Sequence, residues 1–255
     1  MPDFDVTPLV LLTLACVGFG AGFIDSIAGG GGLISMPALL AAGMPPHLAL
    51  GTNKLQSAMG TTFAAANYAR RGLVTRDGLV AGVALTAPAA FAGAFAVTRL
   101  PGDFLVRLIP WLLGAIFVYM LVSPRVGDER RHARLGTISF HVAGGLALGF
   151  YDGFFGPGTG TFWTIGYVTL LGFTLPHATG HTKVMNLTSN LASLAWFALH
   201  GDVLWVTGAL MGAANIAGAL TGSTLAIRRG AGFIRVVFLL VVGATIARLV
   251  WRSFE

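Results

Sequence analysis

Two aspartates and two lysines stand in parts of the chain that are otherwise apolar or weakly polar. Asp25 and Asp152 lie in long apolar stretches, and Lys54 and Lys183 lie among small apolar and polar residues. A charge at the centre of a bilayer costs at least about 2.5 kcal/mol, so such a residue usually pairs with an opposite charge or faces water. A buried lysine that faces water can bind an anion, which makes these four residues the leading candidates for a site.

The four charges are predicted to pair within each half of the chain, Asp25 with Lys54 and Asp152 with Lys183. Two interpretations of the pairs stay open. Each lysine presents its positive charge to a bound anion, or each lysine is held by the aspartate of its own half as a structural ion pair. In a mixed role, the aspartate holds the lysine until an anion or a proton competes for it.

Small polar residues surround both lysines. Hydroxyl and amide groups donate hydrogen bonds, so they suit an oxyanion. Lys54, Ser57 and Thr61 share one helical face, as do Lys183, Asn186 and Asn190. The candidate binding residues beside the lysines are therefore Thr52, Asn53, Gln56, His181, Thr182 and Asn186.

His181 allows two interpretations. A histidine titrates near neutral pH, so this residue could carry a proton. The alternative is a hydrogen-bonded histidine in the protein interior.

Each aspartate is followed closely by glycines. Asp25 precedes Gly29-Gly30-Gly31-Gly32, and Asp152 precedes Gly156-Pro157-Gly158. A helix cannot run smoothly through such sequences, and the next apolar segments, 33–42 and 161–171, are too short to span a bilayer. The pattern predicts a helix, a break and a re-entrant half-helix in each half.

The breaks predict an anion cradle. Freed backbone N–H groups and a half-helix N-terminus together attract negative charge. Gly31, Gly158 and Thr159 are the candidate cradle residues. The alternative is a glycine seam that lets helices pack closely.

The composition is that of an integral membrane protein. Of 255 residues, 55% are hydrophobic and 10% are charged, whereas soluble domains carry about 25% charged residues. Backbone polar groups cannot stay unpaired in lipid, so the apolar blocks are predicted to be helices. The fold class is therefore all-α, with about eight transmembrane helices over 8–28, 47–68, 79–98, 104–122, 137–155, 182–200, 203–227 and 233–250.

Several other classes are disfavoured by the sequence. One cysteine permits no intramolecular disulfide and no cysteine-ligated metal site. Neither Gly-x-Ser-x-Gly nor His-Glu-x-x-His occurs, so we expect no enzymatic activity. We expect no cofactor or metal. The net charge of +6 is explained by loop arginines rather than by nucleic-acid binding.

The two halves are related by an internal repeat. A shift of 127 residues places Asp25 on Asp152, and a shift of 129 places Lys54 on Lys183. The predicted organisation is a first four-helix repeat over 6–123, a cytoplasmic linker over 124–135 and a second four-helix repeat over 136–252. The 129-residue shift also aligns Gly51 with Gly180, Gly72 with Gly201, Gly93 with Gly222 and Phe104 with Phe233.

Arginines predict that the repeats are inverted. Cytoplasmic loops carry an excess of basic residues. If the arginine-rich linker is cytoplasmic, the loop at Arg70-Arg71, two spans earlier, is also cytoplasmic, and its repeat mate at His200-Gly201 is external. Equivalent loops on opposite sides of the membrane are the mark of inverted repeats, the plan of many secondary transporters. Four arginines fall outside (Arg99, Arg107, Arg248, Arg252) and ten inside (Arg70, Arg71, Arg76, Arg125, Arg130, Arg131, Arg134, Arg228, Arg229, Arg235).

The motifs resemble the TauE/SafE sulfite exporter family. They are the first glycine-rich stretch with Pro37, Ala49-Leu50-Gly51-Thr52-Asn53-Lys54, Gly156-Pro157-Gly158-Thr159-Gly160 and Gly180-His181-Thr182-Lys183. The resemblance covers residues 9–252. It implies a multi-pass protein of the cell inner membrane that exports sulfite or a related organosulfur anion.

From the resemblance and the residues together, we expect a secondary transporter that binds its substrate between the repeats at membrane mid-depth. A channel or importer for another small anion is the alternative. The expected partners are the small anion and the lipid bilayer, and not nucleic acid. Assembly into a homo-oligomer is left open.

Overall fold

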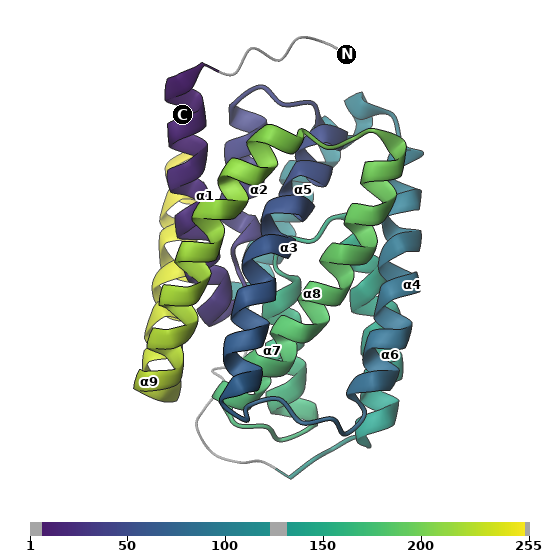
Figure 1. The fold of residues 1–255 in the computed structure, drawn as a ribbon, viewed down its shortest axis with the longest axis vertical. Helices are drawn as coiled ribbons and strands as arrows, with labels where there is room; N and C mark the ends of the chain where they lie inside the picture. The colour runs from purple at the N-terminus through teal and green to yellow at the C-terminus, as the bar shows by residue number, and fades with distance from the viewer. Residues whose placement is uncertain (1–6, 123–131, 253–255) are drawn as a thin grey trace.

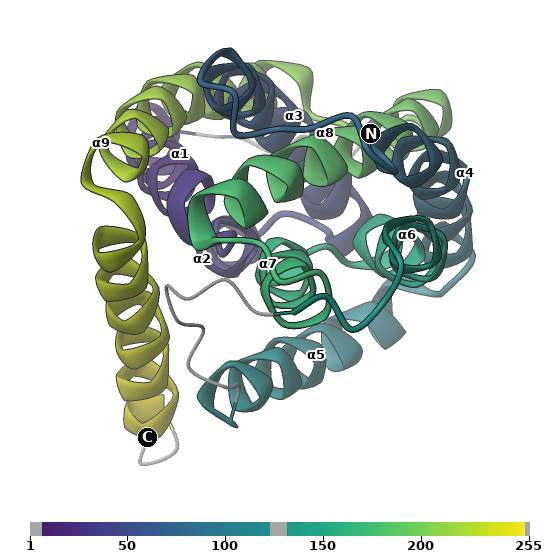
Figure 2. The same cartoon turned by 90° about the horizontal axis from the view of Figure 1, so that it is seen from below.

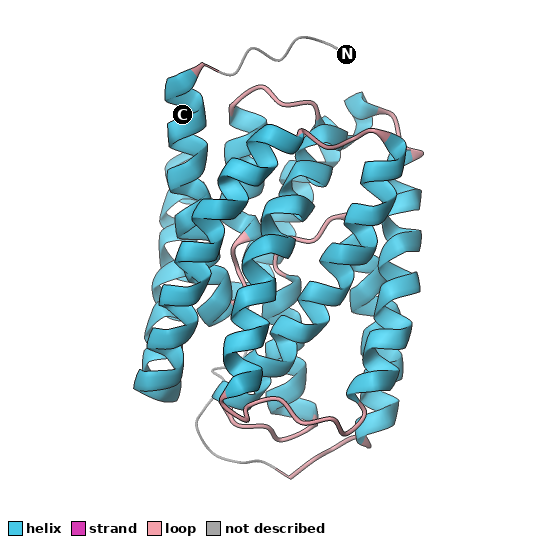
Figure 3. Ribbon diagram, in the orientation of Figure 1, coloured by secondary structure: helices cyan, strands magenta, loops and turns pink. Residues whose placement is uncertain are grey.

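The computed structural model describes residues 7–122 and 132–252, and over these ranges the chain forms helices and no strand (Figure 3). Residues 123–131, which include 124–131 of the expected linker, lie outside the described residues. The helices are α1 (Pro8–Ala28), α2 (Gly32–Ala41), α3 (Pro46–Arg70), α4 (Leu79–Thr98), α5 (Gly102–Val122), α6 (Thr137–Phe154), α7 (Thr159–Leu170), α8 (Leu175–His200) and α9 (Trp205–Arg252).

The helices follow the predicted apolar blocks closely, with one clear difference. The sequence predicts the start of α8 at Thr182, whereas the helix begins at Leu175. Pro176 fits the first turn, where its missing N–H costs nothing, and the polar residues that follow carry little hydropathy. The long α9 is broken at Gly230, which has φ 68° and ψ −161°, between the two blocks predicted for this region.

Three of the described helices have the length and apolar composition to cross a membrane: Pro8–Ala28, Leu79–Thr98 and Trp205–Gly230. Helices α3 and α8 are about as long, but each carries a row of buried polar residues on one face. These two helices therefore carry the candidate site.

Local sequence explains the breaks that flank the site. Helix α1 ends at Gly29, which is left-handed (φ 79°) and donates its N–H to the carbonyl oxygen of Asp25. This is a C-cap that glycine adopts without steric cost. In the second half, Pro157 follows the end of α6, and α7 starts after Gly158 at φ 85°. The short helices α2 and α7 begin at these breaks, as predicted.

Helices α3 and α8 contact each other, and the short helices α2 and α7 pack against them (Figure 2). Helix α1 packs along α9, and α6 packs along α4. In Figure 1 the α3–α4 and α7–α8 connections lie at the lower end, and the α8–α9 connection lies at the upper end. Helices α3 and α8 therefore run in opposite directions.

The apolar core is divided into two clusters. The first gathers residues near the α3 N-terminus and the α8 C-terminus, including Met36, Leu50 and Phe197. The second gathers residues near the opposite ends of these helices, including Tyr68 and Trp163. The buried polar residues of α3 and α8 lie between the two clusters.

Close helix contacts depend on particular glycines. A Cβ at Gly51 would meet the carbonyl oxygen of Asp202, and a Cβ at Gly180 would lie 2.8 Å from the carbonyl oxygen of Leu73. Gly20, in the middle of α1, has nothing within 4 Å of an added Cβ. The first two positions pin the ends of α3 and α8 to loops of the opposite half.

We expect Gly51→Ala to destabilise the protein by about 1–3 kcal/mol, because the new methyl group overpacks a fixed backbone contact. The matched control Gly20→Ala should be neutral or stabilising by about 0.5–1 kcal/mol, since alanine favours the helix. Thermal unfolding in detergent compares the two variants. Equal melting temperatures would contradict the close packing at Gly51.

Candidate functional site

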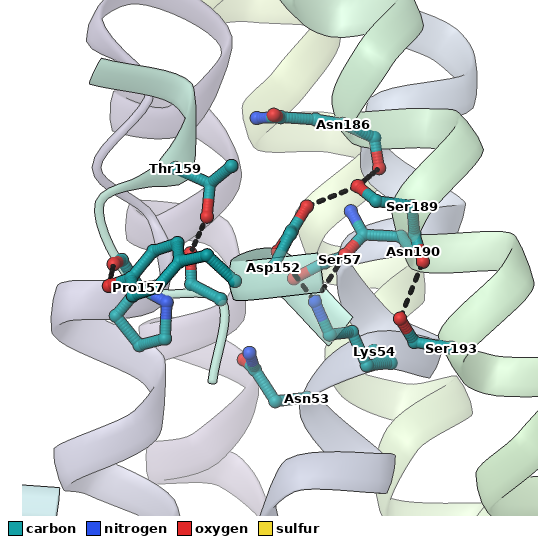
Figure 4. Close-up of polar contacts among 12 residues, drawn as sticks. Asn53, Lys54, Ser57, Asp152, Pro157, Thr159, Asn186, Ser189, Asn190 and Ser193 are labelled. Atoms are coloured by element: carbon teal, nitrogen blue, oxygen red, sulfur yellow. Dashed lines mark hydrogen bonds and ion pairs between the residues drawn. The ribbon is translucent and has the colours of Figure 1, made fainter. Parts of the chain in front are cut away.

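Lys54 and Asp152 form a buried ion pair at the centre of the site. The Lys54 Nζ lies 2.6 Å from Asp152 Oδ1, with the two side chains 2% and 5% exposed. Lys54 also donates to Asn190 Oδ1 at 3.3 Å, and the Ser189 hydroxyl donates to Asp152 Oδ2 (Figure 4). The pair is therefore almost completely shielded and hydrogen-bonded on both sides.

Lys183 and Asp25 form the second ion pair. The Lys183 Nζ lies 2.9 Å from Asp25 Oδ2, with side-chain exposures of 0% and 19%. Lys183 also donates to the backbone carbonyl oxygen of Asp25. Leaving a buried charge without a partner is very costly, so the two aspartates offset much of the cost of burying these lysines.

The prediction that the pairs form within each half was wrong. Lys54 pairs with Asp152, and Lys183 pairs with Asp25, so each ion pair joins the two halves. The physical reason is helix direction. Helix α3 packs against its antiparallel mate α8, which brings each lysine to the aspartate that precedes the other half's break.

The two lysines lie at related depths from opposite ends of the bundle. Each is eight residues from the start of its helix, at Pro46 or Leu175, which corresponds to about 12 Å of helix. The two ammonium groups are thus set about one third of a helix length from opposite ends. The polar layer between them occupies the middle of the protein.

A chain of amide and hydroxyl groups continues from Lys54 into neighbouring helices. Asn53 Oδ1 accepts from Ser35 at 2.6 Å and from Gln56 at 2.9 Å. Gln56 also donates to Ser57 at 3.1 Å and accepts from Asn215 of α9. Asn53 and Gln56 are therefore held in a fixed orientation within two residues of the lysine in the chain.

Thr182 and Asn186 occupy the corresponding places beside Lys183. The hydroxyl of Thr182 lies 3.1 Å from that of Thr164 on α7. Asn186 is 6% exposed and lies against Gly160 at the start of α7, and its Oδ1 has no hydrogen-bond partner among the described residues. Asn186 thus retains unused polar capacity next to the second break.

Thr52 and His181 hold loops rather than contact the lysines. The Thr52 hydroxyl accepts the N–H of Leu204 at 3.0 Å. The repeat-equivalent bond runs from the N–H of Thr75 to His181 Nε2 at 3.2 Å. His181 Nδ1 lies 2.9 Å from the carbonyl oxygen of His177, so Nδ1 donates, Nε2 accepts and the ring is neutral. This geometry fits the interior-histidine interpretation.

The two glycine breaks touch each other. The α-carbon of Gly29 packs against the backbone of Gly160, and Gly32 packs against Pro157. Opposed N-termini of α2 and α7 therefore meet in the middle of the bundle. Each carries partial positive charge, so the breaks add to the positive field of the lysines.

The predicted cradle residues have different surroundings. Gly31 is helical (φ −56°), and an added Cβ would lie 2.6 Å from the carbonyl oxygen of Ala21. Close packing alone accounts for glycine at this position. Gly158 is left-handed at the start of α7, and the Thr159 hydroxyl donates to the carbonyl oxygen of Gly156 at 2.7 Å.

Sequence reasoning missed Gly156, Ser189 and Asn215. Gly156 is left-handed (φ 97°), and an added Cβ would lie 2.9 Å from both Asp152 Oδ1 and Lys54 Nζ. Asn215 stands alone in an apolar stretch of α9, a signal that could have identified it. In the sequence, Ser189 looks like any other small residue of a helix. Its hydrogen bond to Asp152 is evident only from the fold.

Chemically, the site contains two lysines, each paired with the carboxylate of an aspartate. An oxyanion that displaced a carboxylate would meet a lysine ammonium, amide groups and a half-helix N-terminus. The described residues contain no group of three or more His, Cys, Asp or Glu side chains suited to a metal ion. The lysines and the amide groups together suit the binding of an anion.

Known proteins resemble this chain over most of its length. A probable membrane transporter protein, YfcA of Escherichia coli K12, is 42% identical over 250 residues, covering 98% of this chain and 93% of the relative. Probable membrane transporter proteins of a Sinorhizobium species and of Haemophilus influenzae are 44% identical over 240 residues and 43% identical over 242. They cover 94% and 95% of this chain, and 92% and 95% of their own lengths.

No solved structure matches the chain. The family described as "Sulfite exporter TauE/SafE" matches residues 14–249. This match spans both ion pairs and both glycine breaks. The chain is a helical membrane transporter that belongs to the TauE/SafE sulfite exporter family.

Proposed function

We propose that the protein is a secondary transporter of the cell inner membrane that exports sulfite or a related organosulfur anion. The anion binds between the two halves at membrane mid-depth, where it competes with the aspartates for Lys54 and Lys183. The observation that carries this proposal is the pair of buried lysines, 2% and 0% exposed, each held by a carboxylate of the opposite half.

We propose that residues 6–123 and 136–252 are inverted repeats joined by a cytoplasmic linker at 124–135. Contacts that recur with the halves exchanged support this. Gly51 meets Asp202 as Gly180 meets Leu73, and Leu204 donates to Thr52 as Thr75 donates to His181. The exposed Arg70, Arg71, Arg228 and Arg229 would then mark the cytoplasmic face.

Inverted repeats suggest how the anion crosses. The two apolar clusters close the polar layer from opposite ends. An anion could leave on one side if one cluster opened and the cross-half ion pair nearest to it separated. The equivalent movement in the other half would open the other side, which is the alternating access expected of such folds.

The sidedness can be tested with two single cysteines. Arg71 and His200 are repeat mates, and both are exposed at the ends of α3 and α8. In a Cys16→Ser background, we expect Arg71→Cys to react with an impermeant maleimide only from the cytoplasmic side and His200→Cys only from the outside. Labelling of both from the same side would contradict the inverted arrangement.

Flux in reconstituted liposomes tests the substrate class. Sulfite, sulfate, thiosulfate and ethanesulfonate are compared, with protein-free liposomes as the control. We expect saturable sulfite or sulfonate flux well above the control. Movement of only the other anions would favour the alternative of a channel or importer for another small anion.

A further inference from the structure

The two ion pairs are chemically unequal, although the repeat relates them. Asp152 uses both carboxylate oxygens, since Oδ1 accepts from Lys54 at 2.6 Å and Oδ2 accepts from Ser189. Asp25 uses one, since Oδ2 accepts from Lys183 at 2.9 Å. No residue in the described ranges donates to Asp25 Oδ1. The two carboxylates therefore differ in how firmly the protein holds their negative charge.

The two aspartate side chains also differ in their exposed fractions. The Asp152 side chain is 5% exposed and the Asp25 side chain is 19% exposed. The difference has a sequence origin: the 129-residue shift places Ser189 on Gly60, which has no hydroxyl to donate. The difference in hydrogen bonding between the two carboxylates therefore follows from the sequence and not from the rotamer of one side chain.

Hydrogen bonds to a carboxylate favour its ionised form. We infer that Asp25 is the proton-coupling carboxylate of this transporter, while Asp152 is the counter-ion of Lys54 and takes no part in proton coupling. The inference rests on the proposed function, and it assigns the coupled ion to one of two residues that the sequence treats alike.

Few other titratable groups face Asp25. Lys183 approaches from α8, and Tyr68 of α3 lies nearby with its hydroxyl donating to the carbonyl oxygen of Ser26 at 3.0 Å. Helix α2 and the stretch 205–227 of α9, which also pack near α1, contain no titratable side chain. On α7, Tyr167 is occupied by His141. Lys183 is therefore the group that responds when Asp25 changes charge.

The coupled step balances in charge. One proton binds Asp25 Oδ1, the carboxylate becomes a neutral carboxylic acid, and its ion pair with Lys183 is lost. Lys183 keeps its hydrogen bond to the backbone carbonyl oxygen of Asp25 and takes up the oxyanion as its new counter-charge. Release of the anion and the proton on the other side restores the ion pair. With a divalent oxyanion the step carries one net negative charge, so an inside-negative membrane potential drives it outward, in the direction of the proposed export.

The test is the steady-state accumulation of sulfite in proteoliposomes under a gradient of about one pH unit, acid outside. The membrane potential is held at zero with equal potassium and valinomycin. One coupled proton gives about tenfold accumulation per pH unit, because one unit corresponds to a factor of ten in proton activity. We expect wild type and the control Asp202→Asn, which removes a carboxylate outside the site, to reach about tenfold and Asp25→Asn to stay near onefold.

Tenfold accumulation by Asp25→Asn, or an equal loss of accumulation in Asp202→Asn, would overturn the inference. Wild type that equilibrates sulfite without accumulation would overturn the inference and leave the proposed function intact. Wild type that moves no sulfite or ethanesulfonate would overturn the proposed function itself.

A second measurement tests the inference without Asp25→Asn, in case that variant does not fold. Purified wild type and Asp202→Asn are titrated with sulfite in weak buffer containing an indicator dye. We expect each to take up about one proton per bound anion. Binding without proton uptake in wild type would overturn the assignment of Asp25.

Discussion

A protein carrying Lys54→Met together with Asp152→Asn should fold and remain in the membrane but move sulfite at least about 10- to 100-fold more slowly than wild type. The double change removes both charges of a pair that is 2% and 5% exposed. A charge-assisted hydrogen bond contributes about 1.5–3 kcal/mol, which sets the expected loss of flux. Removing a whole buried pair is often neutral for stability.

The single variant Lys54→Met separates structure from function. It leaves the Asp152 carboxylate buried without its cation, which is expected to cost about 3–5 kcal/mol of stability. Melting temperature should therefore fall in the single variant and recover in the double variant, while flux stays low in both. Recovery of flux together with stability would show that the pair is only structural.

A contact between a histidine and an aspartate outside the site provides the control. His200 Nδ1 lies 2.9 Å from Asp202 Oδ2 in the exposed α8–α9 connection. We expect His200→Gln with Asp202→Asn to leave sulfite flux within about twofold of wild type, because exposed pairs contribute about 0–1 kcal/mol.

Gly156→Ala should reduce sulfite flux by at least about tenfold. The new Cβ would lie 2.9 Å from both Asp152 Oδ1 and Lys54 Nζ, so it would push the pair apart or block an approaching anion. Alanine would also adopt a left-handed backbone at φ 97°, which costs about 1–2 kcal/mol. Flux in liposomes and thermal unfolding should be measured on the same protein.

Gly201→Ala separates backbone strain from the effect on the ion pair. Gly201 is also left-handed, at φ 84°, but an added Cβ has nothing within 4 Å. This variant should lose similar stability through its backbone and keep normal flux. Equal flux in Gly156→Ala and Gly201→Ala would remove Gly156 from the site.

Much of the helix pattern could be predicted from hydropathy. Leu79–Thr98 was predicted with both ends correct, and the short helices after the glycine breaks were expected. Hydropathy failed at the start of α8, where polar residues fill the first turns, because these residues face the protein interior and not lipid. Hydropathy measures composition and cannot tell which face of a helix is buried.

The partners within the site could not be predicted from the repeat. An internal repeat makes Asp25 and Asp152 equivalent, so pairing within a half and pairing between halves satisfy the sequence equally well. Antiparallel packing of α3 against α8 decides between them, and this packing depends on glycine contacts across the halves. Ser189 was missed for the same reason, since its partner Asp152 is on another helix.

Equilibrium binding of sulfite to purified protein is the most direct test of the claim that the anion binds at the cross-half lysines. Isothermal titration would compare wild type with Lys54→Met/Asp152→Asn and Lys183→Met/Asp25→Asn, with His200→Gln/Asp202→Asn as the control. We predict that wild type and the control bind sulfite, and that both buried-pair variants lose at least about tenfold in affinity while they remain folded. Wild-type affinity in the two folded buried-pair variants would contradict the claim.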